Sequence, residues 1–221
     1  MLKTPGADGA WMYNRIMLSI YDIWVLGVVN TYAWHCPTKS IQLPFFQKHL
    51  SKRHLDIGPG TGYYLANAGI PSTTSVDVLD LNPNCLDDAK RALNRPGMTT
   101  FLADVLEPLP LVEKYGSIST FYLIHCLPGP LERKMVLFRN LKGFLEEDGV
   151  VYGTTILGTG VFNWFGRIIM HFLNKGRVFD NRGDGEVGIR EALKRDYKVV
   201  RTEVVGNILF FEASQPIFYF Q

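Results

Sequence analysis

Three glycines, Gly58, Gly60 and Gly62, stand at alternate positions where a β-rich run gives way to a helical pattern, within the sequence HLDIGPGTG. Glycine adopts backbone dihedral angles that other residues rarely adopt, and its missing Cβ lets a ligand approach the main chain. The spacing is G-x-G-x-G, whereas a dinucleotide pyrophosphate site typically has G-x-G-x-x-G. An ordinary connection between a strand and a helix would also account for such a turn.

Two carboxylates accompany the glycine turn. Asp56 comes just before it, where its charge would repel a phosphate and suits an ammonium or a sulfonium group. Asp80 ends the second β-rich run, about 20 residues after Gly58, which is the spacing at which a carboxylate meets ribose hydroxyls. A positively charged adenosine derivative satisfies these conditions, and S-adenosylmethionine is such a ligand.

Four motifs occur in an order that is familiar from one enzyme family. HLDIGPGTG, VLDLNP, FLADVLEPLP and FYLIHCLPG resemble those of the class I S-adenosylmethionine-dependent methyltransferases of small molecules, and the resemblance covers about residues 54 to 213. It implies S-adenosylmethionine as the cofactor, with the glycine turn at its methionine moiety, carboxylates at its amino group and ribose, and a further turn at its adenine. The positions that carry these cofactor-binding roles here are Asp56, Gly58, Pro59, Gly60, Thr61, Gly62, Asp80, Leu81, Asn82, Asp104, Val105 and His125.

Some of these positions have simpler interpretations. Asp104 suits a helix or turn cap, and Asn82 suits a turn before Pro83. His125 follows the fourth β-rich run, at the sheet edge where open α/β proteins bind ligands, and its ordinary pKa suits proton transfer near neutral pH. It is our candidate catalytic base, with pocket lining and a buried structural role as alternatives. Neighbouring Cys126 is expected to pack rather than react.

The sequence also narrows the methyl acceptor. It has no Asn-Pro-Pro-Tyr type of motif after the fourth β-rich run, which similar enzymes use on amide or base nitrogens. It has no carboxylate there to hold magnesium, as the metal-dependent catechol methyltransferases need, so we predict no metal. Phe162, Trp164, Phe165 and Phe172 could form an apolar lid with the N-terminal helices, although core packing explains them equally well.

Short β-rich runs alternate with helical patterns from residue 54 onward, which is typical of βαβ units and a parallel sheet. A β-hairpin around Gly206-Asn207 would follow. The predicted fold is α/β and Rossmann-like, with a seven-stranded, mostly parallel sheet, an antiparallel C-terminal hairpin and helices on both faces. The expected strands are 54–57, 75–81, 99–103, 118–124, 150–155, 199–205 and 208–213, and the helical patterns are 63–68, 86–93, 131–146 (closed by Asp148-Gly149), 161–173 and 186–197.

Length and composition fit a single domain. With 221 residues, 47% hydrophobic and 20% charged, the chain is neither disordered nor a repeat. Residues 16–34 are interrupted by Asp22, Gly27 and Asn30, so we predict a buried helix there rather than a membrane span. We divide the domain into a helical preface or lid over 1–50, a cofactor-binding core over 51–158, a lid-like segment over 159–185, and a terminal helix with the hairpin over 186–214.

Charge and cysteine content narrow the partners and the compartment. A net charge of +2, from 23 basic and 21 acidic residues, gives no footprint for nucleic acid. Cys36, Cys85 and Cys126 match no zinc motif or disulfide framework, and the start lacks the apolar core of a secretory signal. We therefore expect a cytoplasmic protein whose oligomeric state stays open, a homodimer included.

Three functions from different classes compete. We favour methyl transfer from S-adenosylmethionine to a small, largely hydrophobic metabolite, such as a secondary metabolite. A protein of this fold could instead bind the cofactor and catalyse a non-methylating reaction such as a pericyclic cyclisation. A regulatory subunit that binds the cofactor without catalysis is the third. Transfer of a labelled methyl group to a product would separate the first from the other two.

Overall fold

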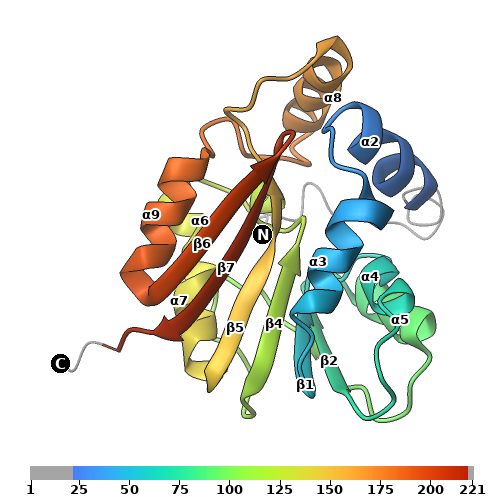
Figure 1. Ribbon diagram of the computed structural model, residues 1–221, viewed down its shortest axis with the longest axis vertical. Coiled ribbons are helices and arrows are strands. Elements are labelled where there is room, and N and C mark those ends of the chain that lie inside the picture. The colour runs from blue at the N-terminus through green and yellow to red at the C-terminus, as the bar shows by residue number, and fades with distance from the viewer. Residues whose placement is uncertain (1–21, 219–221) are drawn as a thin grey trace, which may run out of the picture.

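The computed structural model describes residues 22–218, with side chains from residue 25, and Figure 1 shows the arrangement of its elements. The predicted helical preface therefore lies partly outside the described residues. Its described part comprises η2 (Asp22–Val29), α2 (Asn30–Tyr32), η3 (Thr38–Gln42) and α3 (Leu43–Lys48). Within residues 22–218, no helix is both long enough and apolar enough to cross a membrane.

One seven-stranded sheet forms the centre of the molecule, in the order β3-β2-β1-β4-β5-β7-β6. The first five strands in this order run parallel, and β7 runs antiparallel to both of its neighbours. The predicted α/β, Rossmann-like sheet with an antiparallel C-terminal hairpin is confirmed. The strands are β1 (Arg53–Ile57), β2 (Ser75–Asp80), β3 (Thr100–Leu102), β4 (Tyr115–Phe121), β5 (Leu145–Ile156), β6 (Tyr197–Val205) and β7 (Ile208–Pro216).

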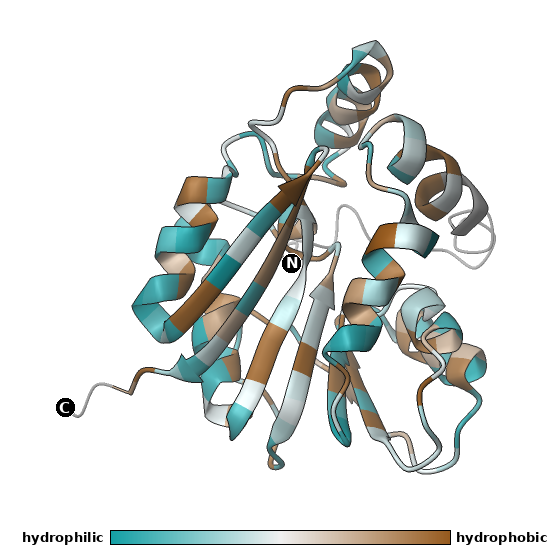
Figure 2. Cartoon of the chain, in the orientation of Figure 1, coloured by the Kyte–Doolittle hydropathy of each residue, from teal (hydrophilic) through white to brown (hydrophobic). Residues whose placement is uncertain are grey.

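Helices cover both faces of this sheet (Figure 1). One face carries α3, α4 (Tyr63–Asn67) and α5 (Pro83–Leu93), and the other carries α6 (Leu131–Lys134), α7 (Val136–Leu141) and α9 (Glu186–Asp196). A further helix, α8 (Trp164–Lys175), lies apart from these two layers, beyond the end of β5. Figure 2 shows hydrophilic residues along much of α9, as expected of a helix with one side in solvent.

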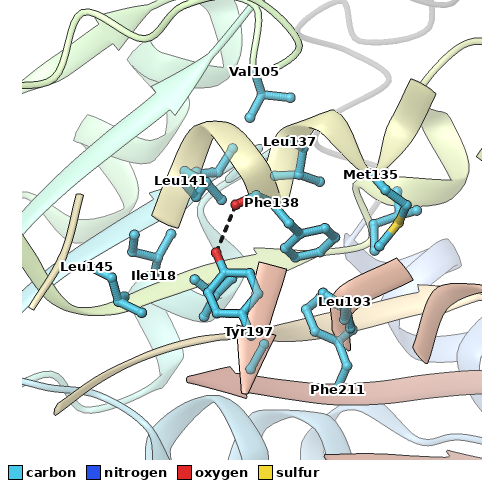
Figure 3. Close-up of a cluster of buried hydrophobic side chains, with 14 of the residues drawn as sticks. Val105, Ile118, Met135, Leu137, Phe138, Leu141, Leu145, Leu193, Tyr197 and Phe211 are labelled. Carbon is cyan, nitrogen blue, oxygen red and sulfur yellow. Dashed lines mark hydrogen bonds between the residues drawn. The ribbon is translucent and has the colours of Figure 1, made fainter. Parts of the chain in front are cut away.

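The strands alternate their side chains between two buried clusters. Val151 on β5 joins the cluster under α6, α7 and α9, whereas its neighbour Tyr152 joins the cluster under α3, α4 and α5. Figure 3 shows the first cluster, in which the Tyr197 hydroxyl donates a 2.9 Å hydrogen bond to the Phe138 carbonyl oxygen. This bond satisfies a polar group that would otherwise be buried alone.

A buried ion pair ties α6 to the loop before α9. Lys134 Nζ lies 2.6 Å from Asp184 Oδ2, and both side chains are almost fully buried. Lys134 Nζ also donates to the Asp180 carbonyl oxygen. The loop is held further by Asn181, whose side-chain amide donates to the Ile156 carbonyl oxygen at 2.9 Å.

The predicted helix over 131–146 is confirmed as far as Leu141 and is wrong at its carboxyl end. The helical turns end at Leu141, a single 3-10 turn, η5 (Lys142–Phe144), follows, and β5 already begins at Leu145. The register between β4 and β5 shifts near Gly116, so that the exposed acidic residues 146–148 project as an irregularity of β5. Asp148-Gly149 therefore belongs to the strand and does not close a helix.

The fourth strand is shorter at its carboxyl end than the predicted 118–124. It ends at Phe121, and Tyr122 adopts a left-handed backbone conformation with φ +58°. A 3-10 turn, η4 (Ile124–Cys126), follows at once. Positive φ is uncommon for a bulky residue. The reversal at Tyr122 turns residues 123–128 across the carboxyl edge of the sheet.

Candidate functional site

A cleft lies at the carboxyl edge of the sheet, where β1, β2 and β3 end opposite η4. Ligands of open α/β sheets bind at this edge. Five of the predicted cofactor-binding residues line the cleft, namely Gly58, Asp80, Leu81, Asp104 and Val105. The other lining residues are Ile57, Leu79, Ala103, Leu123, Cys126, Leu127 and Pro128.

The glycine turn has the backbone that its sequence predicts. Gly58, Gly60 and Gly62 all have positive φ, at +68°, +56° and +76°. A Cβ on Gly62 would lie 2.8 Å from the Ala92 Cβ, so this position also lets α4 approach α5. A Cβ on Gly60 would meet nothing within 4 Å, which leaves the main chain bare toward solvent. The half-buried residues between these glycines, at positions 59 and 61, do not line the cleft.

Asp80 is positioned by the end of β2. Its Oδ1 accepts a 2.7 Å hydrogen bond from the Asn82 backbone N–H. Burial raises the pKa of this carboxyl to about 6, although hydrogen bonds from the backbone partly oppose the shift. The Asn82 side chain instead caps α5 by accepting from the Asn84 backbone N–H at 3.0 Å. Leu81, which is 54% exposed, adds an apolar surface beside the carboxylate.

Asp56 lies beneath the glycine turn and not in the cleft lining. Its Oδ1 accepts a 2.5 Å hydrogen bond from the Ser119 hydroxyl. Burial raises the pKa of Asp56 to about 7, and the nearby charge of Asp80 adds to that shift. The structure thus separates the two predicted carboxylates into one at the cleft and one below it.

A buried histidine, His54, continues the hydrogen-bond chain that starts at Asp56 and passes through Ser119. His54 Nε2 lies 3.1 Å from Ser119 Oγ, and His54 Nδ1 lies 2.8 Å from Ser117 Oγ. Since Ser119 gives its proton to Asp56, the His54 ring must donate to Ser119. Sequence reasoning missed Ser119 and His54. The feature that could have identified Ser119 is the parallel pairing of the two strands, because Asp56 and Ser119 are register partners on β1 and β4.

The loop after β3 accommodates both interpretations of Asp104. Its Oδ1 accepts a 2.9 Å hydrogen bond from the Leu106 backbone N–H, as a turn cap does. Asp104 also lines the cleft, as an adenine-contacting residue would. Val105 is 5% exposed and joins the hydrophobic core while it lines the cleft.

His125 lies on η4 but is buried away from the cleft lining. Its Nδ1 accepts a 3.2 Å hydrogen bond from the Ile156 backbone N–H and lies 3.1 Å from Thr155 Oγ1. The Phe179 ring packs edge-on against the imidazole, with a centroid distance of 4.4 Å. Burial lowers the pKa of His125 to about 3, and the nearby charge of Lys134 acts in the same direction.

This geometry does not favour the predicted general base. A neutral imidazole has one free lone pair, and the Ile156 N–H already occupies it at Nδ1. The proton then sits on Nε2, so the ring cannot accept a second one without losing its neutral state in a buried site. The contacts instead fasten η4 to the end of β5.

An apolar cluster adjoins the cleft at Cys126, and we call it the edge cluster. Cys126 lines the cleft and also packs against this cluster. Of the aromatic residues predicted as a lid, Phe162 and Phe165 pack against it, whereas Trp164 and Phe172 are exposed. The buried members are Val29, Ala33, Trp34, Cys36, Tyr122, Ile156, Met170, Val178, Phe179, Ile208 and Phe210.

No group of three or more potential metal ligands occurs within residues 22–218. Of the residues in the glycine turn, only Gly58 lines the cleft; Gly60, like Gly62, does not. What the cleft offers is therefore the first glycine of the turn, a half-buried carboxylate and apolar walls. This donor set suits an adenosine ligand whose ribose binds Asp80 and whose adenine lies against apolar side chains.

Known proteins with similar sequences decide the family. The physcion biosynthesis cluster O-methyltransferase of Aspergillus chevalieri is 46% identical over 216 residues, which cover 96% of this chain and 97% of that protein. The chain belongs to the small-molecule S-adenosylmethionine-dependent methyltransferases. The methyltransferase verB of Penicillium polonicum is 41% identical over 223 residues, covering 94% of this methyltransferase and 98% of verB. The N-methyltransferase vrtF of Penicillium aethiopicum is 39% identical over 185 residues, or 83% and 78% of the two chains.

Solved structures agree on the fold of this methyltransferase. The complex of DhpI with S-adenosylhomocysteine superposes with a TM-score of 0.66 at 15% identity, and the match covers 98% of each chain. PigF with S-adenosylhomocysteine gives a TM-score of 0.66 at 13% identity, over 96% of this chain and 63% of PigF. No protein-family profile matches the chain.

Proposed function

We propose that this methyltransferase moves a methyl group from S-adenosylmethionine to a hydroxyl oxygen of a small, largely apolar metabolite. The observation that carries the proposal is the continuity of the carboxyl-edge cleft with the apolar edge cluster through Cys126. Such a site suits an uncharged acceptor better than a polymer or a charged metabolite. The O-methyltransferase of the physcion cluster supports an oxygen acceptor, whereas the N-methyltransferase vrtF marks nitrogen as the competing choice.

The cleft residues take complementary roles in binding the cofactor. Asp80 accepts hydrogen bonds from the ribose hydroxyls, and Leu81, Asp104 and Val105 surround the adenine. The main chain of the glycine turn faces the methionine moiety, and Asp56 attracts its ammonium group from below, through water or directly. When bound, the cofactor supplies a methyl group on a positively charged sulfur, which is a strong leaving group.

The edge cluster contributes to acceptor binding. Trp34 is 1% exposed, and its Nε1–H has no hydrogen-bond acceptor within the described part of the chain. A buried donor of this kind is costly unless something pairs with it. An oxygen of the acceptor would satisfy the Trp34 N–H and would orient the ring system that carries the reacting hydroxyl.

Positioning is the main catalytic contribution of this chain. Holding the hydroxyl in line with the sulfur and the methyl carbon turns a bimolecular displacement into a unimolecular one, which can supply about 7–11 kcal/mol of the barrier. The apolar cluster also excludes water from the reacting groups. We assign no proton transfer to His125, and the hydroxyl proton passes to the acceptor's own neighbouring groups, or to solvent once the product leaves the site.

The test is transfer of labelled methyl from S-adenosylmethionine to matched acceptors. A panel of hydroxyaromatic compounds and the corresponding aromatic amines is incubated with the full chain, and products are separated and identified. We expect label in an aryl methyl ether and equimolar release of S-adenosylhomocysteine. Label only in an N-methyl product would replace oxygen by nitrogen, and turnover without label transfer would overturn the proposal.

The matched variant for the acceptor side is Trp34→Phe, which removes the indole N–H and keeps an aromatic ring. We expect the acceptor KM to rise about fivefold to tenfold, because one hydrogen bond to the acceptor is lost. The affinity for S-adenosylhomocysteine should stay unchanged. Phe162→Leu, which removes a ring that packs edge-on against Trp34 but no polar group, is the control. An unchanged KM in Trp34→Phe would remove this residue from the acceptor site.

A further inference from the structure

The helix α8 exposes a row of large apolar side chains that neither the fold nor the proposed site uses. Trp164, Ile168 and Phe172 are 70%, 47% and 65% exposed. Their spacing of four residues places them in one row along the outer side of the helix. Val161, three residues before the helix begins, is also largely exposed, at 94%. Contiguous exposed apolar surface of this kind marks an interaction site.

Basic residues form a second row beside the apolar one. Arg167, His171 and Lys175 are exposed and also recur every four residues, three positions after the members of the apolar row. No acidic residue occurs between Asp148 and Asp180 in the sequence. Among the described residues, Arg167 and Lys175 form no ion pair. The outer side of α8 is therefore apolar and cationic at once.

The inner side of α8 packs where the acceptor is expected. Met170 is a buried member of the edge cluster, and Phe165, Ile169 and Leu173 pack against it from α8. The helix is thus a single layer between the edge cluster and the surroundings. Figure 1 shows it protruding at the end of the molecule beyond β5, next to α2.

We propose that the outer side of α8, which we call the α8 face, docks the enzyme on an anionic lipid bilayer. An interfacial helix buries its apolar row at the boundary of headgroups and acyl chains while basic side chains meet the lipid phosphates. Trp is a residue type that favours this boundary, and the exposed Trp164 is the first residue of the helix. A largely apolar acceptor partitions into lipid, so docking would bring α8 and the edge cluster behind it to the substrate.

Charge distinguishes the anionic bilayer from two other possible partners of the α8 face, which are a second copy of the chain and the segment 1–21. In a symmetric dimer the same patch meets itself, so the basic row of one copy, with Arg167 and Lys175, would meet the basic row of the other. The segment 1–21 carries Lys3, Asp8 and Arg15 as its charged residues, so its net charge of +1 does not complement the α8 face. An anionic bilayer complements both the charge and the apolar row.

The experiment is co-sedimentation of the full chain with vesicles of phosphatidylcholine, with and without phosphatidylserine. We expect binding to the anionic vesicles, weakened by high salt because screened charges attract less. Trp164→Ser and Phe172→Ser should each lower the partition coefficient about tenfold or more, and Lys175→Gln about fivefold. Val112→Ser and Lys198→Gln, which alter an exposed apolar residue and an exposed lysine far from α8 in the sequence, are the matched controls.

Other results would overturn the proposal. Absence of binding to anionic vesicles, or equal loss in the control variants, would leave the α8 face without a lipid partner. A concentration-dependent dimer that Trp164→Ser abolishes would assign the face to a second copy. Crosslinks between Lys3 and Lys175 in vesicle-free protein would assign it to the segment 1–21. Vesicle binding is measured without cofactor or acceptor, so its failure is distinct from failure of the proposed methyl transfer.

Discussion

Asp80 and Asp56 show how one residue type takes two roles through its surroundings. Burial is the main cause that raises the pKa of Asp80 to about 6 and the pKa of Asp56 to about 7, but only Asp80 lines the cleft. Both were predictable because they are tied to the glycine turn by short sequence distances. The wall formed by Leu123, Leu127 and Pro128 was not predictable, because its direction depends on the left-handed backbone at Tyr122.

Cofactor affinity is expected to rise with pH between about 5 and 8. An ionised carboxylate is the stronger acceptor for ribose hydroxyls, and Asp80 ionises as the pH passes its pKa of about 6. Asp80→Asn should weaken binding of S-adenosylhomocysteine by roughly 1–3 kcal/mol at pH 8 and flatten this rise, leaving the part due to Asp56. Titration calorimetry across pH measures both. Asp87→Asn, on the exposed side of α5, is the control, and equal affinity of Asp80→Asn and wild type would remove Asp80 from the site.

His125 is expected to affect stability more than turnover. Its folded pKa of about 3 lies below the unfolded value of about 6.5, so its contribution to stability is complete above pH 6.5 and is lost as the pH falls toward 3. His125→Gln should therefore flatten the acid side of the unfolding free energy, measured with urea, relative to His171→Gln. Turnover should fall by less than about tenfold. A loss of about 10²–10⁴, as for a general base, would contradict this assignment.

At the scale of elements, hydrophobic patterns located every strand but not every boundary. The runs around Leu55 and Val78 were clear because both neighbours of each strand bury it. The predicted helix over 131–146 is too long because its apolar spacing continues into β5, whose first residues leave the regular register. A hydrophobic pattern shows which residues are buried but not whether they are helical or extended. Here the successive elements α7 and β5 bury side chains on the same side of the sheet.

Gly62 and Gly60 make a matched pair for testing the turn. Gly62→Ala is expected to lower the free energy of unfolding by about 2–4 kcal/mol, because the new Cβ would press on α5 at a positive φ. Gly60→Ala has only the positive φ and open space, so about 1 kcal/mol is expected. Urea unfolding gives both values. Equal destabilisation by the two substitutions would contradict the close approach of α4 to α5.

At the scale of the whole molecule, the Lys134–Asp184 pair joins parts that lie 50 residues apart in sequence. Lys134→Met is expected to destabilise the fold by about 3–5 kcal/mol, because it leaves Asp184 buried without its partner. Lys134→Met with Asp184→Leu should recover much of that loss, since no lone charge remains. Unfolding free energies of the two single variants and the double variant form the test. Simple addition of the two single effects would contradict the pairing.

The place of β7 in the sheet has a consequence for synthesis. Because β7 lies between β5 and β6, the ribosome synthesises β6 before β7, the strand that pairs with it among the described residues. Until β7 emerges, β6 has no partner and β5 keeps an open edge, even if the parallel part of the sheet has formed. The nascent chain therefore carries unpaired edges of β5 and β6 until β7 has been synthesised, and unpaired edges of this kind are prone to edge-to-edge aggregation.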